Sequence, residues 1–309
     1  MKHKSLLMLG VSAMMLTSCD QEIINNFGDN GFPQLTVTGT VAGQDSVKSR
    51  AFNTSWEAGD EIGLISSGYI NKKYVTTDGD GIFTTECENY FFKDVNSATF
   101  RAYYPYTTSV VGGESISFQV LSTANEEGQK PNDYLWAEGY ASYKKPSLSL
   151  SFKHVMTKVI INLRASTADG FKADDIFATN GNYKTSDASL SNVYKNVYFN
   201  LVDGETQGVY GYYQIDMTDP VDDTENNVRT YTMILAPQSN VSFSQVFNKD
   251  LSTEQIYKVT LNKTDWEPGT IYTYNLVLKK ERLVVDSQYT ISDWDTADAV
   301  DSELHISAY

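Results

Sequence analysis

Alternation of apolar and polar residues with a period of two recurs along most of this chain. The first clear example is Leu35 to Val41, which reads LTVTGTV, with Leu35, Val37 and Val41 apolar and threonines between them. A period of two is typical of a β-strand with one buried face. The same kind of strand signal returns at Ile62–Leu64, Phe100–Tyr104, Ile116–Val120, Asp133–Ala141, Leu148–Met156, Val159–Leu163, Tyr210–Met217, Arg229–Leu235, Val241–Phe247, Gln255–Leu261, Tyr272–Leu278 and Leu283–Val285. No apolar pattern with the helical period lasts for three turns, so the sequence predicts an all-β fold.

Turn residues separate these segments. Gly59-Asp60 predicts a turn before the second strand, and Thr76–Gly81 predicts a hairpin turn. The aspartates of that hairpin also suggest a calcium loop, but the spaced oxygen ligands and the distal glutamate of an EF-hand are missing. The apolar positions change phase after Met156, which predicts a bulge or turn near Thr157. Lys144-Lys145-Pro146 marks the predicted domain boundary.

The first residues predict export. Lys2 and Lys4 precede an apolar segment that is shorter than the about 20 residues a membrane-spanning helix needs, which is typical of a signal peptide. The sequence Leu-Thr-Ser-Cys ending at Cys19 is similar to a bacterial lipobox. We therefore expect lipoprotein-processing enzymes to remove residues 1–18 and Cys19 to carry lipid, with residues 19–33 as a flexible tether. The prediction is a surface-exposed lipoprotein of the outer membrane, and the alternative is an ordinary signal peptide with an incidental cysteine.

Composition and charge narrow the function. The chain has 309 residues, of which 41% are hydrophobic, enough to build the cores of two domains. Its 39 acidic and 24 basic residues give a net charge of −15, which argues against nucleic acid because affinity for phosphates comes from Lys and Arg. Cys87 is the one cysteine besides Cys19, so with Cys19 lipidated no intramolecular disulfide is expected. We interpret Cys87 as a small core filler.

Side chains that often carry chemistry form no clear motif. His154 has no Ser, Cys or Asp at a spacing typical of a triad, and three histidines in all argue against a multi-histidine metal site. Paired carboxylates of a hydrolase would arise by chance among so many acids. We expect neither an enzyme nor a cofactor or metal. Tyr103, Tyr104 and Tyr106 either form a platform that stacks on sugars or pack the sandwich. A surface glycan-binding lipoprotein is therefore the alternative function.

Seven short motifs follow one another along the chain. They are W-x-x-G-D-x-I-G at Trp56–Gly63, Y-Y-P-Y at Tyr103–Tyr106, D-Y-L-W-A at Asp133–Ala137, L-S-F-K-H at Leu150–His154, L-A-P-Q at Leu235–Gln238, W-E-P-G at Trp266–Gly269 and I-S-D-W at Ile291–Trp294. In the order of these motifs the chain resembles the fimbrillins of Bacteroidetes, a family of lipoprotein precursors of type V pilus subunits that includes fimbrillin-A and the Mfa-like anchor and tip proteins. The resemblance implies two tandem transthyretin-like β-sandwiches, here residues 34–146 and 147–309. It also implies an adhesive structural role as stalk, tip or anchor.

The two ends of the chain suggest how such subunits would join. An arginine-specific protease that cuts between Arg50 and Ala51 would release the strand 35–41 and leave an open groove, which another pilin subunit would fill by strand exchange. The tail 300–309 is the candidate donor because it alternates again, with Ser302 as the polar exception on the apolar face. The apolar residues on that face are Val300, Leu304, Ile306 and Ala308. Alternatively, Arg50 is a plain surface arginine and the tail is an edge strand of its own sandwich.

Overall fold

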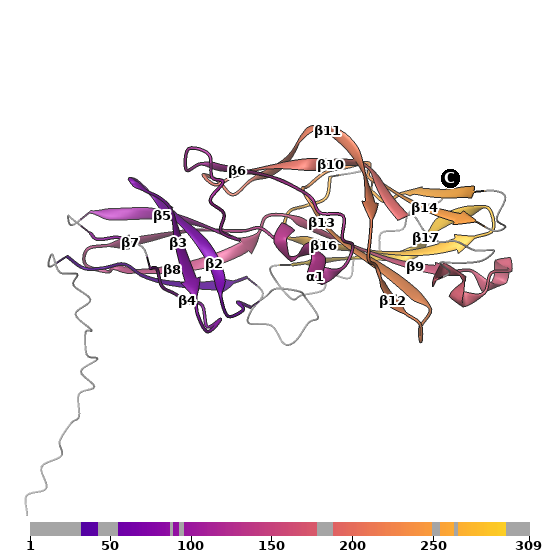
Figure 1. Cartoon of the computed structure of the whole chain (residues 1–309), viewed down its shortest axis with the longest axis horizontal. Coiled ribbons are helices and arrows are strands. Elements are labelled where there is room, and N and C mark those ends of the chain that lie inside the picture. The colour runs from indigo at the N-terminus through magenta and orange to yellow at the C-terminus, as the bar shows by residue number, and fades with distance from the viewer. Residues whose placement is uncertain are drawn as a thin grey trace, which may run out of the picture.

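Two groups of β-strands, each around its own apolar core, follow one another along the long axis of the molecule (Figure 1). The computed structural model describes residues 32–42, 55–86, 89–92, 96–177, 188–248, 254–262 and 265–294. Helical structure in these ranges is limited to α1 (Glu126–Gln129) and three short 3-10 segments. The prediction of an all-β fold with two sandwiches is confirmed.

The first sandwich contains seven strands that close on themselves. Their hydrogen-bonded order is β3-β2-β5-β7-β8-β1-β4. A bridge between Val75 of β3 and Thr84, directly after β4, joins the two ends of this series through hydrogen bonds of 2.8 and 2.9 Å. The strands are β1 (Thr36–Val41), β2 (Asp60–Ser66), β3 (Tyr69–Thr76), β4 (Ile82–Phe83), β5 (Ser97–Tyr104), β7 (Leu135–Ser142) and β8 (Ser147–His154).

The alternation in the sequence explains how these strands pack. In β8 every second side chain from Leu148 to His154 is buried and the others are exposed. β1 shows the same pattern, with its three threonines exposed. The buried faces meet in one core that also contains Trp56 and Phe100. Each strand therefore has one face in the core, as a period of two requires.

The second sandwich consists of two five-stranded sheets. One has the order β11-β10-β14-β15, with β6 also paired to β10, and the other has the order β12-β13-β9-β16-β17. The sequence pattern did not predict β10, because register shifts near Ser191 and Tyr194 interrupt its alternation. The strands are β6 (Ser115–Gln119), β9 (Thr157–Ala165), β10 (Ala188–Asn200), β11 (Thr206–Met217), β12 (Val221–Asp223), β13 (Val228–Leu235), β14 (Ser242–Asn248), β15 (Glu254–Thr260), β16 (Thr270–Lys279) and β17 (Arg282–Asp293).

The predicted boundary near Pro146 does not separate the two sandwiches. Ser142 and Lys145 exchange backbone hydrogen bonds of 3.0 Å, so this stretch is the hairpin turn between β7 and β8. β8 belongs to the first sandwich, whereas β6, earlier in the chain, belongs to the second. The last crossing follows His154 and leads into β9, next to the change of phase predicted near Thr157. Pro and Lys mark turns in general, so they do not distinguish a hairpin from a domain boundary.

Candidate functional site: the position of the first strand

β1 occupies an interior position in the first sandwich. It pairs in parallel with β8 over six residues, and on its other side it pairs antiparallel with β4. At its two ends, the N–H of Thr36 donates to the carbonyl of Pro146 at 2.9 Å and the N–H of Ala42 donates to the carbonyl of Phe152 at 2.8 Å. Loss of β1 would therefore open the sheet between β8 and β4 rather than trim its edge.

Neither neighbour of β1 shares a tight turn with it. β4 begins at Ile82 and β8 begins at Ser147, both far along the chain from Val41. β1 is thus held laterally, by backbone hydrogen bonds and by side-chain packing. Its removal would open no hairpin with β4 or β8.

The inward face of β1 is apolar. Leu35, Val37 and Val41 are 2%, 2% and 3% exposed and belong to the core of the first sandwich. Thr38 lies on the outer face, where its hydroxyl donates to the carbonyl of Leu148 at 3.4 Å. At about 1.5–3 kcal/mol for each buried aliphatic side chain, the three inward residues together contribute roughly 5–9 kcal/mol.

Gly39, at the centre of β1, faces a cluster of aromatic rings. Phe83 and Phe152 each pack edge-on against Trp56 with ring centroids 5.1 Å apart. The indole N–H of Trp56 donates to the carbonyl of Gly39 at 2.7 Å. A Cβ on residue 39 would lie 2.9 Å from Phe152 and 3.1 Å from Phe83, which is closer than carbon atoms pack. The position of β1 therefore accepts large side chains at 35, 37 and 41 but only a very small one at 39.

A half-buried carboxylate lies beside this aromatic cluster. The ring of Tyr104 packs edge-on against Trp56 at 5.6 Å, and its hydroxyl donates to Asp60 Oδ1 at 3.1 Å. The N–H of Glu57 donates to Asp60 Oδ2 at 2.8 Å. Burial raises the pKa of Asp60, and these hydrogen bonds partly oppose the rise. Burial also raises the pKa of Tyr104, and the negative charge of Asp60 adds to that rise.

The three neighbouring tyrosines do not form a sugar-stacking platform. Tyr103 is fully buried, and its hydroxyl donates to Asn71 Oδ1 at 2.6 Å. Tyr104 packs against Trp56, and Tyr106 packs against the core of the second sandwich. The interpretation that these rings pack the protein is correct.

His154 lies in a buried cluster where the two sandwiches meet. Its Nδ1 is 2.7 Å from Asp133 Oδ1, and both side chains are fully buried. The ring of Trp294 stacks on the imidazole at 3.9 Å, and Lys158 Nζ lies 5.6 Å from the centre of the indole. Because the cluster is closed to solvent and joins β8 to the start of β9 and the end of β17, its role is structural. Asp133 was missed in the sequence because it lies 21 residues from His154, a spacing that no motif marks.

The hairpin turn between β3 and β4 has a structural explanation as well. Asp80 Oδ1 accepts hydrogen bonds from the Thr76 hydroxyl at 3.2 Å and from the Ile82 N–H at 2.9 Å. Within the described ranges, no three His, Cys, Asp or Glu side chains gather closely enough to hold a metal ion. Among the helices of the same ranges, none is long and apolar enough to cross a membrane.

The other residues singled out in the sequence lie outside the described residues. They are Cys19, Arg50, Ala51, Cys87, Val300, Leu304, Ile306 and Ala308. The described chain ends at Trp294, whose N–H donates to the carbonyl of Gly269 at 2.7 Å. The last described residue therefore lies next to the junction of the two sandwiches, where its ring stacks on His154.

Comparison with known proteins places this fold in a family. The sequence profile described as fimbrillin-like matches residues 49–294, which is most of the chain. The chain belongs to the fimbrillin-like family. This is a family of fimbrial and adhesion subunits rather than of enzymes. The matched range contains the strands that flank β1, and it ends at Trp294.

Relatives of this fimbrillin-like chain agree with the assignment. The chain is 24% identical over 314 residues to the proposed fimbrium subunit Fim1C of Bacteroides uniformis, covering 95% of this chain and 96% of that protein. A crystal structure of a proposed cell adhesion protein from Bacteroides ovatus matches with a TM-score of 0.66 and 22% identity, over 86% of this chain and 99% of that one. A second such protein, from Bacteroides uniformis, matches with a TM-score of 0.61 and 22% identity, over 84% and 98%. At these identities the structural matches support the fold.

Proposed function

We propose that this chain is a structural subunit of a surface fimbrium and joins its neighbours by exchanging β1 for a strand of another subunit. The observation that carries the proposal is the interior position of β1, between two strands with which it shares no turn. Family membership supports the fimbrial role. In this proposal an arginine-specific protease cuts between Arg50 and Ala51, and β1 then leaves.

Departure of β1 would expose two kinds of surface at once. The facing backbone groups of β8 and β4 would lose their hydrogen-bond partners. The core would lose the side chains of Leu35, Val37 and Val41, which leaves apolar pockets beside Phe152. Unpaired strand edges next to apolar pockets recruit a strand from another chain. The aromatic cluster around Gly39 adds selectivity, because the incoming strand needs a small residue at that place.

The tail sequence fits this requirement in two registers. If the tail runs opposite to the direction of β1, Ser302 takes the place of Gly39. The large residues Val300, Leu304 and Ile306 then take the places of Val41, Val37 and Leu35. If the tail runs in the same direction as β1, Ala308 takes the place of Gly39, with Leu304 and Ile306 at the places of Leu35 and Val37. Apart from glycine, alanine and serine have the smallest side chains: alanine adds one carbon at the crowded position, and serine adds a carbon and a hydroxyl oxygen.

Two substitutions in the tail test the exchange and distinguish the registers. Folded precursor is treated with an arginine-specific protease, and polymers are measured by size-exclusion chromatography. Ser302→Phe should abolish polymerisation in the first register and Ala308→Phe in the second, since a phenyl ring has no room beside Trp56. Ser307→Phe, on the opposite face of the alternating tail, is the matched control and should polymerise. Normal polymerisation of both test variants would refute the tail as donor.

The cut itself has a separate test. Arg50→Gln should keep the chain monomeric under the same protease, because β1 stays covalently attached and continues to fill its place. N-terminal sequencing of wild-type polymers should begin at Ala51. Polymers that begin upstream of Ala51, or protection of Arg50 while other arginines are cut, would contradict the proposal. Lipid on Cys19 would hold the uncut precursor at the outer membrane until this step.

A further inference from the structure

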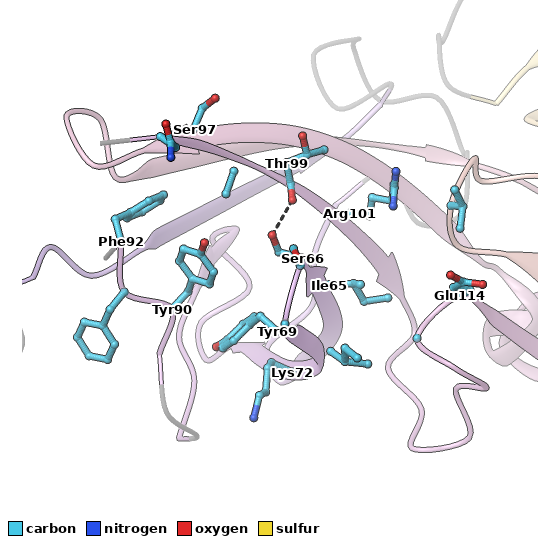
Figure 2. A pocket seen from close by; sticks show the side chains of 18 of the residues that line it. Ile65, Ser66, Tyr69, Lys72, Tyr90, Phe92, Ser97, Thr99, Arg101 and Glu114 are labelled. Carbon is cyan, nitrogen blue, oxygen red and sulfur yellow. Dashed lines mark hydrogen bonds between the residues drawn. The ribbon is translucent and has the colours of Figure 1, made fainter. Parts of the chain in front are cut away.

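A cleft on the first sandwich has Tyr90 and Phe92 in its wall (Figure 2), and Val202 of the turn between β10 and β11 also lines it. Its volume is about 960 Å³. The turn between β2 and β3, the segment 89–92, the start of β5 and the connection before β6 form its walls. It lies on a rigid frame, because β2, β3 and β5 are hydrogen-bonded to one another.

One wall of the cleft is aromatic. Tyr90 is half-buried, and three rings hold it edge-on: Tyr69 at 5.4 Å, Phe92 at 5.0 Å and Phe100 at 4.9 Å. Figure 2 shows Tyr90 and Tyr69 together on one side of the cleft. An aromatic ring held by other rings is pre-organised, so a ligand that stacks on it does not lose affinity by ordering it.

The opposite wall is polar. The Ser66 hydroxyl donates to the carbonyl of Thr99 at 2.7 Å and keeps its lone pairs as acceptors. Arg101 contacts Glu138 through Nε at 3.3 Å, and a guanidinium carries five N–H donors in all. Lys72 Nζ lies 5.5 Å from the ring of Tyr69, so this second cation is on the aromatic side of the cleft. The cleft therefore combines an aromatic surface with a hydroxyl group and cationic donors.

We propose that this cleft binds a short oligosaccharide. A pyranose has an apolar C–H face that suits the face of an aromatic ring and a rim of hydroxyls that needs donors and acceptors, which are the two walls described above. A wholly apolar ligand would desolvate Ser66 and Arg101 without compensation. On its β2 side, β5 is paired only at Arg101–Tyr103, so the start of β5 in the cleft wall leaves an edge to which an extended peptide could add. Binding of such a peptide, with no binding of a saccharide, would contradict the proposal. The net charge of −15 opposes a nucleic acid.

The aromatic wall depends on the residues that lead into β1. The N–H of Leu35 donates to the carbonyl of Tyr90 at 3.0 Å, and the N–H of Phe92 donates to the carbonyl of Pro33 at 3.3 Å. The amide of Asn89 donates to the carbonyl of Leu35 at 3.1 Å. A chain that has lost β1 loses all three hydrogen bonds to segment 89–92. Saccharide binding is thereby linked to occupation of the β1 position. A change in saccharide binding when β1 leaves during assembly rests on the proposed function.

The binding test uses the intact chain on an array of immobilised neutral and acidic oligosaccharides, followed by calorimetry with each saccharide that binds. Tyr90→Ala should weaken binding about tenfold, as expected for loss of one aromatic contact. Ser67→Trp, at an exposed position on the rim, should block the cleft without removing a core side chain. Tyr210→Ala, which removes an exposed tyrosine of the second sandwich, is the matched control and should bind like wild type.

Binding to no saccharide on the array would overturn the proposal, as would unchanged binding by Ser67→Trp. The link to β1 is tested with chain that is cut after Arg50 and separated from its first strand in mild denaturant. This chain should bind the same saccharide at least tenfold more weakly, while cut chain that retains the strand binds normally. Equal binding by both would remove the link and leave the cleft assignment intact. Because the array uses uncut chain, failure of the exchange mechanism would not alter its result.

Discussion

Replacing Gly39 by valine should destabilise the uncut precursor and leave the assembled fimbrium unaffected. Gly39 faces the rings of Phe152 and Phe83, and a Cβ there would lie 2.9 and 3.1 Å from them. In the uncut chain these rings cannot move freely because both pack against Trp56. After exchange, however, residue 39 has left with β1, so the substitution no longer acts.

The expected magnitude combines two opposing effects. Overpacking of a well-packed core costs about 1–3 kcal/mol. Replacing glycine restricts the unfolded chain, which raises the free energy of unfolding by about 0.4–1 kcal/mol. We therefore expect a net loss of about 1–2 kcal/mol in the free energy of unfolding. For a domain of roughly 100 residues, such as the first sandwich, each kcal/mol lowers the unfolding midpoint by roughly 4–8 °C.

Thermal unfolding of the uncut chain, followed by circular dichroism, measures the first effect. Thr40→Val is the matched control, because residue 40 is the exposed neighbour of Gly39 on the same strand. Its midpoint should stay close to wild type, as for most surface substitutions. The second effect is measured on polymers formed after cleavage, whose dissociation in denaturant should match wild type.

Two results would refute this reasoning. An unchanged midpoint for Gly39→Val would show that the aromatic cluster adapts to a side chain at this place. Weakened polymers would show that residue 39 remains in the assembled subunit, and hence that β1 is not exchanged.

Three further outcomes are expected. Leu304→Asp combined with Ile306→Asp should abolish polymerisation and leave the unfolding midpoint of the monomer unchanged, whereas early unfolding of the monomer would show that the tail belongs to its own fold. Cys19→Ala should lose metabolic labelling by a palmitate analogue, and equal labelling of wild type and variant would contradict lipidation at this residue. Asp60→Asn should change how the free energy of unfolding depends on pH. Burial raises the pKa of Asp60 in the folded state above 3.8. Protonated Asp60 therefore stabilises the fold most below pH 3.8, and this stabilisation declines as the pH rises through the raised pKa. Denaturant unfolding across this acidic range should show that decline in wild type and not in the variant.

Local pattern was sufficient to predict most individual strands. β1 and β8 alternate over their whole length, and their buried faces are the ones that the apolar residues mark. β10 was missed because register shifts within it break the period of two. An alternating pattern indicates that one face of a strand is buried. The pattern is therefore lost where a bulge turns the following side chains to the other face.

The candidate site was predictable only in part. The segment of β1 was recognised, but its partners were not, because β4 and β8 lie far away in the sequence. The sequence pattern did not single out Gly39. Its importance comes from Trp56, Phe83 and Phe152, which reach it from three other parts of the chain. The assignment of β8 to the first sandwich and β6 to the second likewise follows from pairing rather than from turn composition.

The sequence by itself determined the all-β class, the strand character of 35–41 and the family resemblance, because each depends on residue types at short or fixed spacing. The tertiary structure alone decided that β1 lies between two strands, that residue 39 must be small, and that the residues leading into β1 hold the aromatic wall of a cleft. Strand pairing and ring packing join residues that are far apart along the chain. The free energy of these contacts depends on closing long loops and filling a shared core, and no local pattern records either.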